Sequence, residues 1–226
     1  MKVLIACEES QRTCSEFRKR GHEAYSCDII PCSGGHPEWH IKADVLSVIN
    51  GGGGITLQDR TKIDVDRWDL IIAHPPCTYL SHAATRHHSL KLTPINCINS
   101  RTLQRIDAMQ FFMRFVFADC DRIAIENPVG IMNTAYRQPD QVINPWMFSE
   151  GPDDKENYVT KRTCLWLKGL KPLEWDHSIP PVDNKELFGT ISSGKAKNWS
   201  DSATRDPSVR SKTFPGIAKA FAEQWG

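Results

Sequence analysis

The first thirty residues alternate between apolar strands and a helix, and this order limits the possible folds more than any other feature of the chain. A short apolar, β-branched run over residues 2–7 predicts a buried strand. Widely spaced apolar positions, Cys14 and Phe17, among charged residues predict a helix over 8–20, and residues 22–30 predict a second strand. Such a βαβ unit requires parallel strands joined by a right-handed crossover.

The same alternation continues along the chain. Strands are expected at residues 69–73, 122–125 and 163–168, and helices at 100–117 and 217–225. The helix at 100–117 is the clearest, because one of its faces carries apolar side chains three and four residues apart, at Leu103, Ile106, Met109, Phe112, Met113 and Val116. The glycine run 51–54 and the polar residues up to Asp66 predict a flexible surface loop. We therefore expect one α/β domain over residues 1–226, with a mainly parallel, Rossmann-like sheet and helices on both faces.

Composition limits the class of protein. The chain has 226 residues, a formal net charge of +1 and eight scattered cysteines. A net charge so close to zero argues against an affinity for nucleic acid built mainly on phosphate contacts, although charge can be segregated on one face. The longest apolar runs have the length of strands, so no membrane-spanning helix is expected. The apolar N-terminal run is too short for a secretory signal, and we therefore expect reduced thiols and a cytoplasmic protein.

Two strand ends carry the residues with the clearest chemistry. His74-Pro75-Pro76-Cys77 follows the predicted strand 69–73, and Glu126-Asn127-Pro128 follows the strand 122–125. Two prolines stiffen the first turn, because each fixes its own φ and restricts the residue before it. Such a turn holds the next side chain, a thiol, at the edge of the sheet. In open parallel sheets, ligands bind at the carboxyl ends of the strands, so both segments are candidates for a site.

A Pro-Cys and a Glu-Asn, each at a strand end, resemble the cytosine C5-methyltransferases. The resemblance implies a class I, S-adenosylmethionine-dependent methyltransferase fold in which Cys77 attacks C6 of cytosine and Glu126 grips the N3 edge. It also implies that Arg162, just before the strand 163–168, points its guanidinium into the catalytic pocket. The chemistry needs such groups, because C5 of cytosine is too weakly nucleophilic to take a methyl group directly. Covalent addition at C6 divides one difficult step into two easier ones.

The resemblance also implies a binding site for S-adenosylmethionine. The family has a glycine-rich turn after the first strand, whereas this chain has Ala6-Cys7-Glu8-Glu9-Ser10 without a glycine. Asp28, at the end of the second strand, is placed to accept hydrogen bonds from ribose hydroxyls, and Asp44 is placed to read the adenine amino group. The segment 210–216 resembles the closing segment of the family, which returns to the cofactor pocket. The expected cofactor-binding residues are Ala6, Cys7, Glu8, Ser10, Asp28, Asp44 and Pro75.

The expected partner is nucleic acid, and DNA in particular. Only residues 169–210 are available for recognising a target, which is too short for the conventional recognition domain of the family. Trp175 and Trp199 in this insertion are suited to stacking on bases. Either sequence specificity is low, or a protein partner supplies it, or the substrate is smaller than duplex DNA. A base within a duplex would have to flip out to reach Cys77.

Three other interpretations compete with this one. Cys27, Cys32, His36 and His40 have the ligand types of a zinc site but not the spacing of a common finger. We therefore expect no metal. An amino-group methyltransferase acting on adenine N6 or cytosine N4 would use the two prolines, but the residues on either side of them do not fit. A non-catalytic nucleotide- or DNA-binding protein that kept the fold is the third alternative, which the missing glycines favour.

Overall fold

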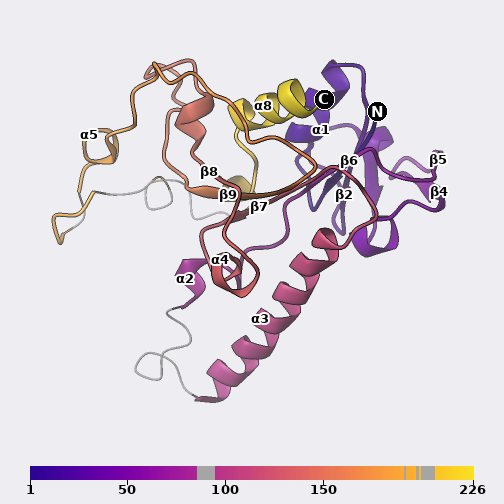
Figure 1. The fold of residues 1–226 in the computed structure, drawn as a ribbon, viewed down its shortest axis with the longest axis horizontal. Helices are drawn as coiled ribbons and strands as arrows, with labels where there is room; N and C mark the ends of the chain where they lie inside the picture. Colours follow the sequence, from indigo (N-terminus) through magenta and orange to yellow (C-terminus); the bar gives the residue numbers. More distant parts are fainter. Residues whose placement is uncertain (86–94, 191, 197–198, 200–206) are drawn as a thin grey trace.

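The computed structural model describes residues 1–85, 95–190, 192–196, 199 and 207–226, and in this part of the chain a seven-stranded sheet forms the centre (Figure 1). The strands are β1 (Lys2–Ala6), β2 (Glu23–Asp28), β3 (His40–Lys42), β4 (Gly53–Thr56), β5 (Lys62–Val65), β6 (Leu70–Ala73), β7 (Ile123–Pro128), β8 (Gln141–Ile143) and β9 (Thr163–Lys168). The helices are α1 (Arg12–Lys19), α2 (His82–Thr85), α3 (Ile95–Val116), α4 (Met132–Ala135), α5 (Asn184–Phe188), α7 (Pro207–Arg210) and α8 (Pro215–Trp225), with 3-10 turns η1 (Pro37–Trp39), η2 (Val45–Ser47) and η4 (Pro145–Phe148).

The central sheet has the strand order β3-β2-β1-β6-β7-β9-β8. The neighbouring strands from β3 to β7 are parallel, and β9 runs antiparallel to both β7 and β8. The prediction of an α/β fold with a mainly parallel sheet is therefore confirmed, and the arrangement is consistent with a Rossmann-like fold. The order reverses between β1 and β6, so a crevice is expected outside the carboxyl ends of these two strands.

Helices cover both faces of the sheet. Alternate residues of β1 point to opposite sides: Val3 and Ile5 pack in the same cluster as α1 and α8, whereas Leu4 and Ala6 pack in the cluster that holds α3. Helices α1 and α8 also contact each other. In Figure 1, α8 lies above the sheet and α3 below it. Within the described residues, no helix combines the length and the apolar character needed to cross a membrane.

The prediction of a flexible loop between residues 51 and 66 was wrong. Strands β4 and β5 form an antiparallel hairpin there, with Ile55 paired to Ile63. Ile55, Leu57 and Val65 are buried, so the hairpin packs its apolar side against the core. The alternation of apolar and polar residues on either side of the turn stabilises strands, and it outweighs the flexibility of the glycines.

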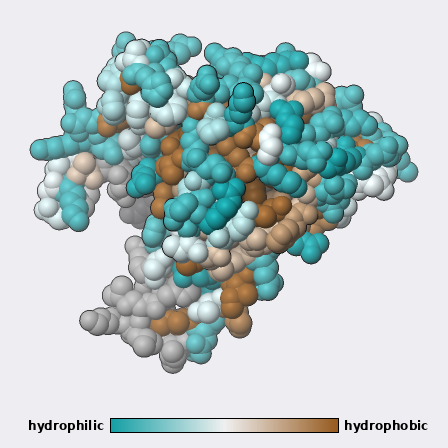
Figure 2. All heavy atoms as spheres, in the orientation of Figure 1, coloured by the Kyte–Doolittle hydropathy of each residue, from teal (hydrophilic) through white to brown (hydrophobic). Residues whose placement is uncertain are grey.

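Helix α3 is longer than expected, and the first part of its apolar face is not covered. Phe112 and Phe115 are fully buried, but Leu103 and Ile106 are 65% and 45% exposed. The amino-terminal half of α3 projects beyond the sheet (Figure 1), and apolar side chains are visible on this projecting part in Figure 2. The periodicity therefore located the helix correctly, whereas its contact with the core is confined to the second half.

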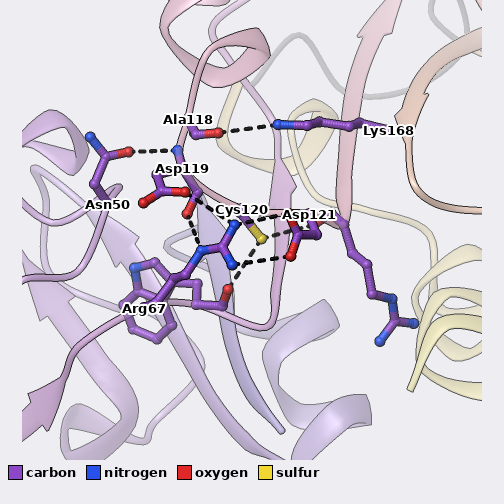
Figure 3. Close-up of polar contacts among 9 residues, drawn as sticks. Asn50, Arg67, Ala118, Asp119, Cys120, Asp121 and Lys168 are labelled. Atoms are coloured by element: carbon purple, nitrogen blue, oxygen red, sulfur yellow. Dashed lines mark hydrogen bonds and ion pairs between the residues drawn. The ribbon is translucent and has the colours of Figure 1, made fainter.

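The loop between α3 and β7 closes the pole of the sheet at the amino ends of β6 and β7. Figure 3 shows Arg67 paired with Asp119 and Asp121, at 3.0 and 2.9 Å, while Asn50 accepts a hydrogen bond from the Asp119 backbone. The Cys120 thiol is buried beside these pairs and donates to backbone carbonyls. These contacts are structural, and the carboxyl ends of the strands lie at the other pole.

Candidate active site

The carboxyl end of β6 leads directly into the turn that carries Cys77. His74 continues the parallel pairing with β1, since its backbone N–H donates to the Ala6 carbonyl at 2.9 Å. Pro75 is buried, and the chain reaches the surface at Pro76 and Cys77. The Cys77 carbonyl then accepts hydrogen bonds from the next turn, so the loop folds back on itself. The Cys77 side chain is thus exposed at the carboxyl edge of the sheet.

Strand β7 holds this turn in place through its own carboxyl end. The Asn127 side chain donates to the Pro75 carbonyl at 2.7 Å, in a buried contact. Farther along, Ile131 N–H donates to the Leu80 carbonyl at 2.8 Å, and Gly130 pairs with Ser81 in an isolated bridge. These bonds tie the segment after Cys77 to the segment after Glu126. The two predicted motifs therefore lie side by side.

Cys77 and Glu126 also interact electrostatically. Desolvation raises the pKa of Cys77, and the charge of Glu126 raises it further, whereas Lys161 and Arg210 lower it. A thiol must ionise to act as a nucleophile, so these two cations support the nucleophilic form. Lys161 precedes β9, and its Nζ donates to the Arg210 carbonyl at 2.9 Å. The bond brings the end of α7 close to the site.

Glu126 has a partner that the sequence pattern did not indicate. Its Oε2 lies 3.1 Å from Nδ1 of His74, and the two side chains are only 23% and 9% exposed. Desolvation acts to raise the pKa of Glu126, but the hydrogen bond and charge of His74, together with Lys161, outweigh it, so the pKa lies below its ordinary value. The carboxylate therefore favours its ionised form in the free protein.

The predicted role of Arg162 is not supported by this geometry. Arg162 is exposed, and the thiol whose pKa it lowers is Cys164, on β9. Its neighbour Lys161 is half-buried and acts on both Cys77 and Glu126. Successive residues of an extended chain point in opposite directions, so only one of the two can face the site. We therefore replace Arg162 by Lys161 as the cation of this site.

The loop after β1 makes its turn without glycine. Cys7 and Gln11 both have a φ of 59°, in the left-handed region that glycine prefers. Ala6 and Glu8 are buried, and Ser10 is half-buried. The Glu8 carboxylate accepts backbone hydrogen bonds from the first turn of α1, at 2.7 and 3.2 Å. Both of its oxygens are therefore engaged, and only the backbone of this residue is left for a ligand.

The ends of β1, β2 and β3 lie close together around two carboxylates. The charges of Asp28 and Asp44 both act on Cys7, where desolvation is the larger cause of a raised thiol pKa. Each carboxylate uses Oδ1 to accept one backbone N–H, at 3.2 Å from Ile30 and 3.0 Å from Leu46. Their Oδ2 atoms therefore remain as acceptors at this edge.

Ile29 and Ile30, next to Asp28, are 71% and 50% exposed. Exposed apolar side chains beside hydrogen-bond acceptors suit a flat, partly polar ligand such as a nucleoside. The segment before α8 lies beside the start of α1, because Arg12 donates to the Thr213 carbonyl at 3.0 Å. The residues at this edge therefore offer hydrogen-bond acceptors and exposed apolar side chains to a ligand.

Both histidines considered as zinc ligands have other partners. Both ring nitrogens of His40 are engaged, at 2.9 Å from Ser26 Oγ and from the Ile30 carbonyl. His36 lies 2.9 Å from Glu38 and stacks on Trp39. In the described ranges, no three His, Cys, Asp or Glu side chains gather in a way that could hold a metal ion.

Two arginines of α3 hold the residue that follows the Cys77 turn. Arg101 lies over the Tyr79 ring, 5.2 Å from its centroid, and Arg105 Nε donates to the Tyr79 carbonyl at 3.0 Å. In the described part of the chain, Arg101 Nε and Arg105 Nη2 are buried without a hydrogen-bond partner. Desolvation and the charge of Arg101 both lower the pKa of Arg105.

The insertion at 169–210 lies partly outside the described residues, which leave out 191, 197–198 and 200–206. Its described part forms an extended arm that carries α5 away from the sheet (Figure 1). Trp199 packs edge-on against Phe214 at 5.2 Å and lies 5.5 Å from Lys161 Nζ, so this aromatic joins the arm to the site. Trp175 lies against His177.

Comparison of the chain with protein-family models and with curated protein sequences gives no match.

Proposed function

We propose that this protein transfers a methyl group from S-adenosylmethionine to C5 of cytosine in nucleic acid, through a covalent bond between Cys77 and C6. The observation that carries the proposal is the pairing of Cys77 with Glu126 at neighbouring strand ends, with Asn127 bonded to Pro75 between them. A thiol nucleophile beside a carboxyl group is the combination that addition to a pyrimidine ring needs.

The strand order supports the finer fold assignment. The strands from β3 to β7 follow the 3-2-1-4-5 order of doubly wound sheets once the β4–β5 hairpin is set aside, and an antiparallel pair takes the place of the last strand. Cys77 follows β6 on one side of the strand reversal, and Asp28 ends β2 on the other side. This arrangement is what we expect of a class I methyltransferase, with the substrate and the cofactor meeting at the switch point.

Each residue of the site has its own role in the proposed reaction. Cys77 Sγ forms the bond to C6, and the electron pair that this displaces is taken up at N3, where the Glu126 carboxyl group shares a proton. Lys161 favours the thiolate electrostatically. The Asp28 and Asp44 carboxylates and the loop after β1 would hold S-adenosylmethionine, which supplies the methyl group. Loss of the C5 proton then allows the bond between Cys77 and C6 to break.

Arg101 and Arg105 support a substrate that carries phosphate. Their unpaired donors lie beside the turn that follows Cys77, so a phosphate next to the target base could satisfy them. DNA is our proposed substrate class, with low sequence specificity because the insertion is short. We also propose a cytoplasmic location, because all eight cysteines are free thiols.

The test is to trap the covalent intermediate. DNA containing 5-fluorocytosine, incubated with the protein and S-adenosylmethionine, should give an adduct that survives denaturing electrophoresis and maps to the Cys77 peptide. Fluorine replaces the C5 proton whose loss is needed to release the enzyme. Cys77→Ser should abolish the adduct, because a hydroxyl is a far weaker nucleophile. Cys97→Ser is the matched control, since this thiol is also exposed but lies on α3.

Mass spectrometry of nucleosides from treated DNA and RNA identifies the product. We expect 5-methylcytosine. N6-methyladenine or N4-methylcytosine as the only product would decide for an amino methyltransferase. Absence of any methylated nucleoside, together with no heat released on titration with S-adenosylmethionine, would decide for a non-catalytic binding protein.

A further inference from the structure

His74 lies at the strand reversal between two carboxylates, the buried Glu8 and the half-buried Glu126. It follows β6, the strand between β1 and β7, so Glu8 lies beyond β1 on one side and Glu126 on the other. Nδ1 of His74 is 3.1 Å from Glu126 Oε2, and the charge of His74 acts on Glu8 as well. Within the described residues, Nε2 of His74 is buried and has no hydrogen-bond partner.

This geometry favours a proton shared between His74 and Glu126. A carboxylate oxygen can only accept, so a proton must lie between it and Nδ1 for a hydrogen bond to form. Glu8 cannot take that role, because its two oxygens already accept from the backbone of α1. The pair therefore stores one proton next to the candidate nucleophile.

We propose that His74 is a positioning residue whose Nδ1 holds the proton that Glu126 transfers to N3 of the target cytosine. This inference rests on the proposed cytosine C5 chemistry. As the Cys77 thiolate bonds to C6, N3 gains an electron pair. The proton leaves Nδ1 of the doubly protonated ring for Glu126 Oε2, the neutral ring keeps its other proton on Nε2, and the carboxyl group then donates the transferred proton to N3. When C5 takes the methyl group, N3 returns the proton by the same path, so no proton is consumed.

Other charged groups surround this pair. Lys161, before β9, faces both Glu126 and the thiol. Arg210 acts on the thiol and not on the carboxylate. An imidazole can both give and take a proton, whereas Glu126 alone, with its lowered pKa, favours the form without one. Glu126 is ionised in the free protein, whereas the reaction at N3 needs an acid. The proton on His74 supplies that acid through Glu126.

The test uses two amide substitutions of His74. In His74→Asn the amide nitrogen takes the place of Nδ1, so the hydrogen bond to Glu126 remains while the stored proton is lost. In His74→Gln the amide nitrogen lies near the place of Nε2, so both are lost. His22→Asn is the control, because His22 lies at the amino end of β2, at the other pole. Rates of 5-methylcytosine formation are measured against pH, with KM and kcat separated.

We expect His74→Asn to keep the KM for DNA and to lose about 10²-fold in kcat at neutral pH, the usual effect of losing one acid–base group. The alkaline limb of its pH profile should move to lower pH, because the proton must then reside on Glu126 alone. His74→Gln should raise KM as well, since Glu126 is no longer oriented. A wild-type rate and pH profile in His74→Asn would overturn the proposal.

A second measurement separates this inference from the proposed function. The ring-proton resonances of His74 are followed through a pH titration of the free protein, and Glu126→Gln should change their titration curve. If the curve changes but no 5-methylcytosine or adduct forms in the wild type, the proposed function fails while the shared proton stands. If the wild type methylates cytosine but the titration is independent of Glu126, the inference fails and the function stands.

Discussion

Gly130 allows β7 and the Cys77 loop to approach closely, and replacing it with alanine tests how tightly the two are coupled. A Cβ added at Gly130 would lie 2.0 Å from the Leu80 carbonyl oxygen and 2.9 Å from the Ser81 Cα. All of these neighbours are backbone atoms, so no side chain can move aside. The two segments must separate by about 1 Å to restore an ordinary contact.

The cost of that shift has two parts. Overpacking typically costs about 1–3 kcal/mol. Separation would also break the 2.8 Å bond from Ile131 N–H to the Leu80 carbonyl, which contributes about 1 kcal/mol. We therefore expect Gly130→Ala to lower the free energy of unfolding by about 2–4 kcal/mol, or the melting temperature by roughly 5–15 °C in a protein of this size. A displacement of about 1 Å at Cys77 should also cost about 10²-fold in methyl transfer.

Two assays check this prediction. Scanning calorimetry gives the melting temperature, and alkylation by iodoacetamide, read by peptide mass spectrometry, gives the reactivity of Cys77. Gly54→Ala is the matched control, because a Cβ at Gly54 meets nothing within 4 Å. Equal melting temperatures for the two variants, with an unchanged alkylation rate at Cys77, would refute the steric reasoning.

The other predictions concern the cofactor edge and the cation of the site. Asp28→Ala and Asp44→Ala should each weaken binding of S-adenosylmethionine by about 1.5–3 kcal/mol, because each removes a charged hydrogen-bond acceptor, while the fold is retained. Unaltered calorimetric affinity in both variants would remove the cofactor assignment. Lys161→Met should raise the pKa of Cys77 further, because a cation that lowers it is lost, and so should slow alkylation of Cys77 at neutral pH. Arg162→Met should change that rate little, and the opposite order would restore the original assignment.

The sequence located the two central motifs because their strands are short and begin with buried apolar residues. Residues 70–73 are all buried, so the run has a clear start and a clear end. The end places His74 at the edge of the sheet, and parallel pairing of β6 with β7 then brings Glu126 alongside. Neither the end of β6 nor its pairing with β7 depends on how individual side chains pack. This is why the positions of Cys77 and Glu126 could be predicted from the order of apolar and polar residues alone.

Other features depended on information that the pattern does not contain. The choice between Lys161 and Arg162 requires the phase of the chain entering β9, and a shift of one residue reverses which side chain faces the site. The partner of Glu126 requires the rotamer of His74, which the pattern treated only as part of a stiff turn. Strand β8 (Gln141–Ile143) has only three residues, too few for an alternation to be recognised. The alternate apolar residues Ile55 and Leu57 indicate a strand, but the adjacent glycine run led to the prediction of a loop.

The glycine-free loop after β1 is the clearest departure from the expected pattern, and its structure explains how the turn is kept. A left-handed conformation costs a non-glycine residue about 1–2 kcal/mol, and Cys7 and Gln11 both adopt one. Such strain persists only where the surroundings determine the backbone. Gln11 bonds through its side chain to both backbone groups of His36, at 2.8 and 3.0 Å, and Glu8 holds the start of α1.

These contacts hold the tight turn from outside it, whereas a glycine would allow the turn by its own conformational freedom. Gly34 completes the arrangement: a Cβ there would lie 2.6 Å from the Gln11 side chain, so only glycine lets the 33–36 segment close over the loop. The first turn itself has no glycine, but the 33–36 segment that packs on it requires one, Gly34. It follows that a missing glycine motif does not by itself argue against a nucleotide-binding turn.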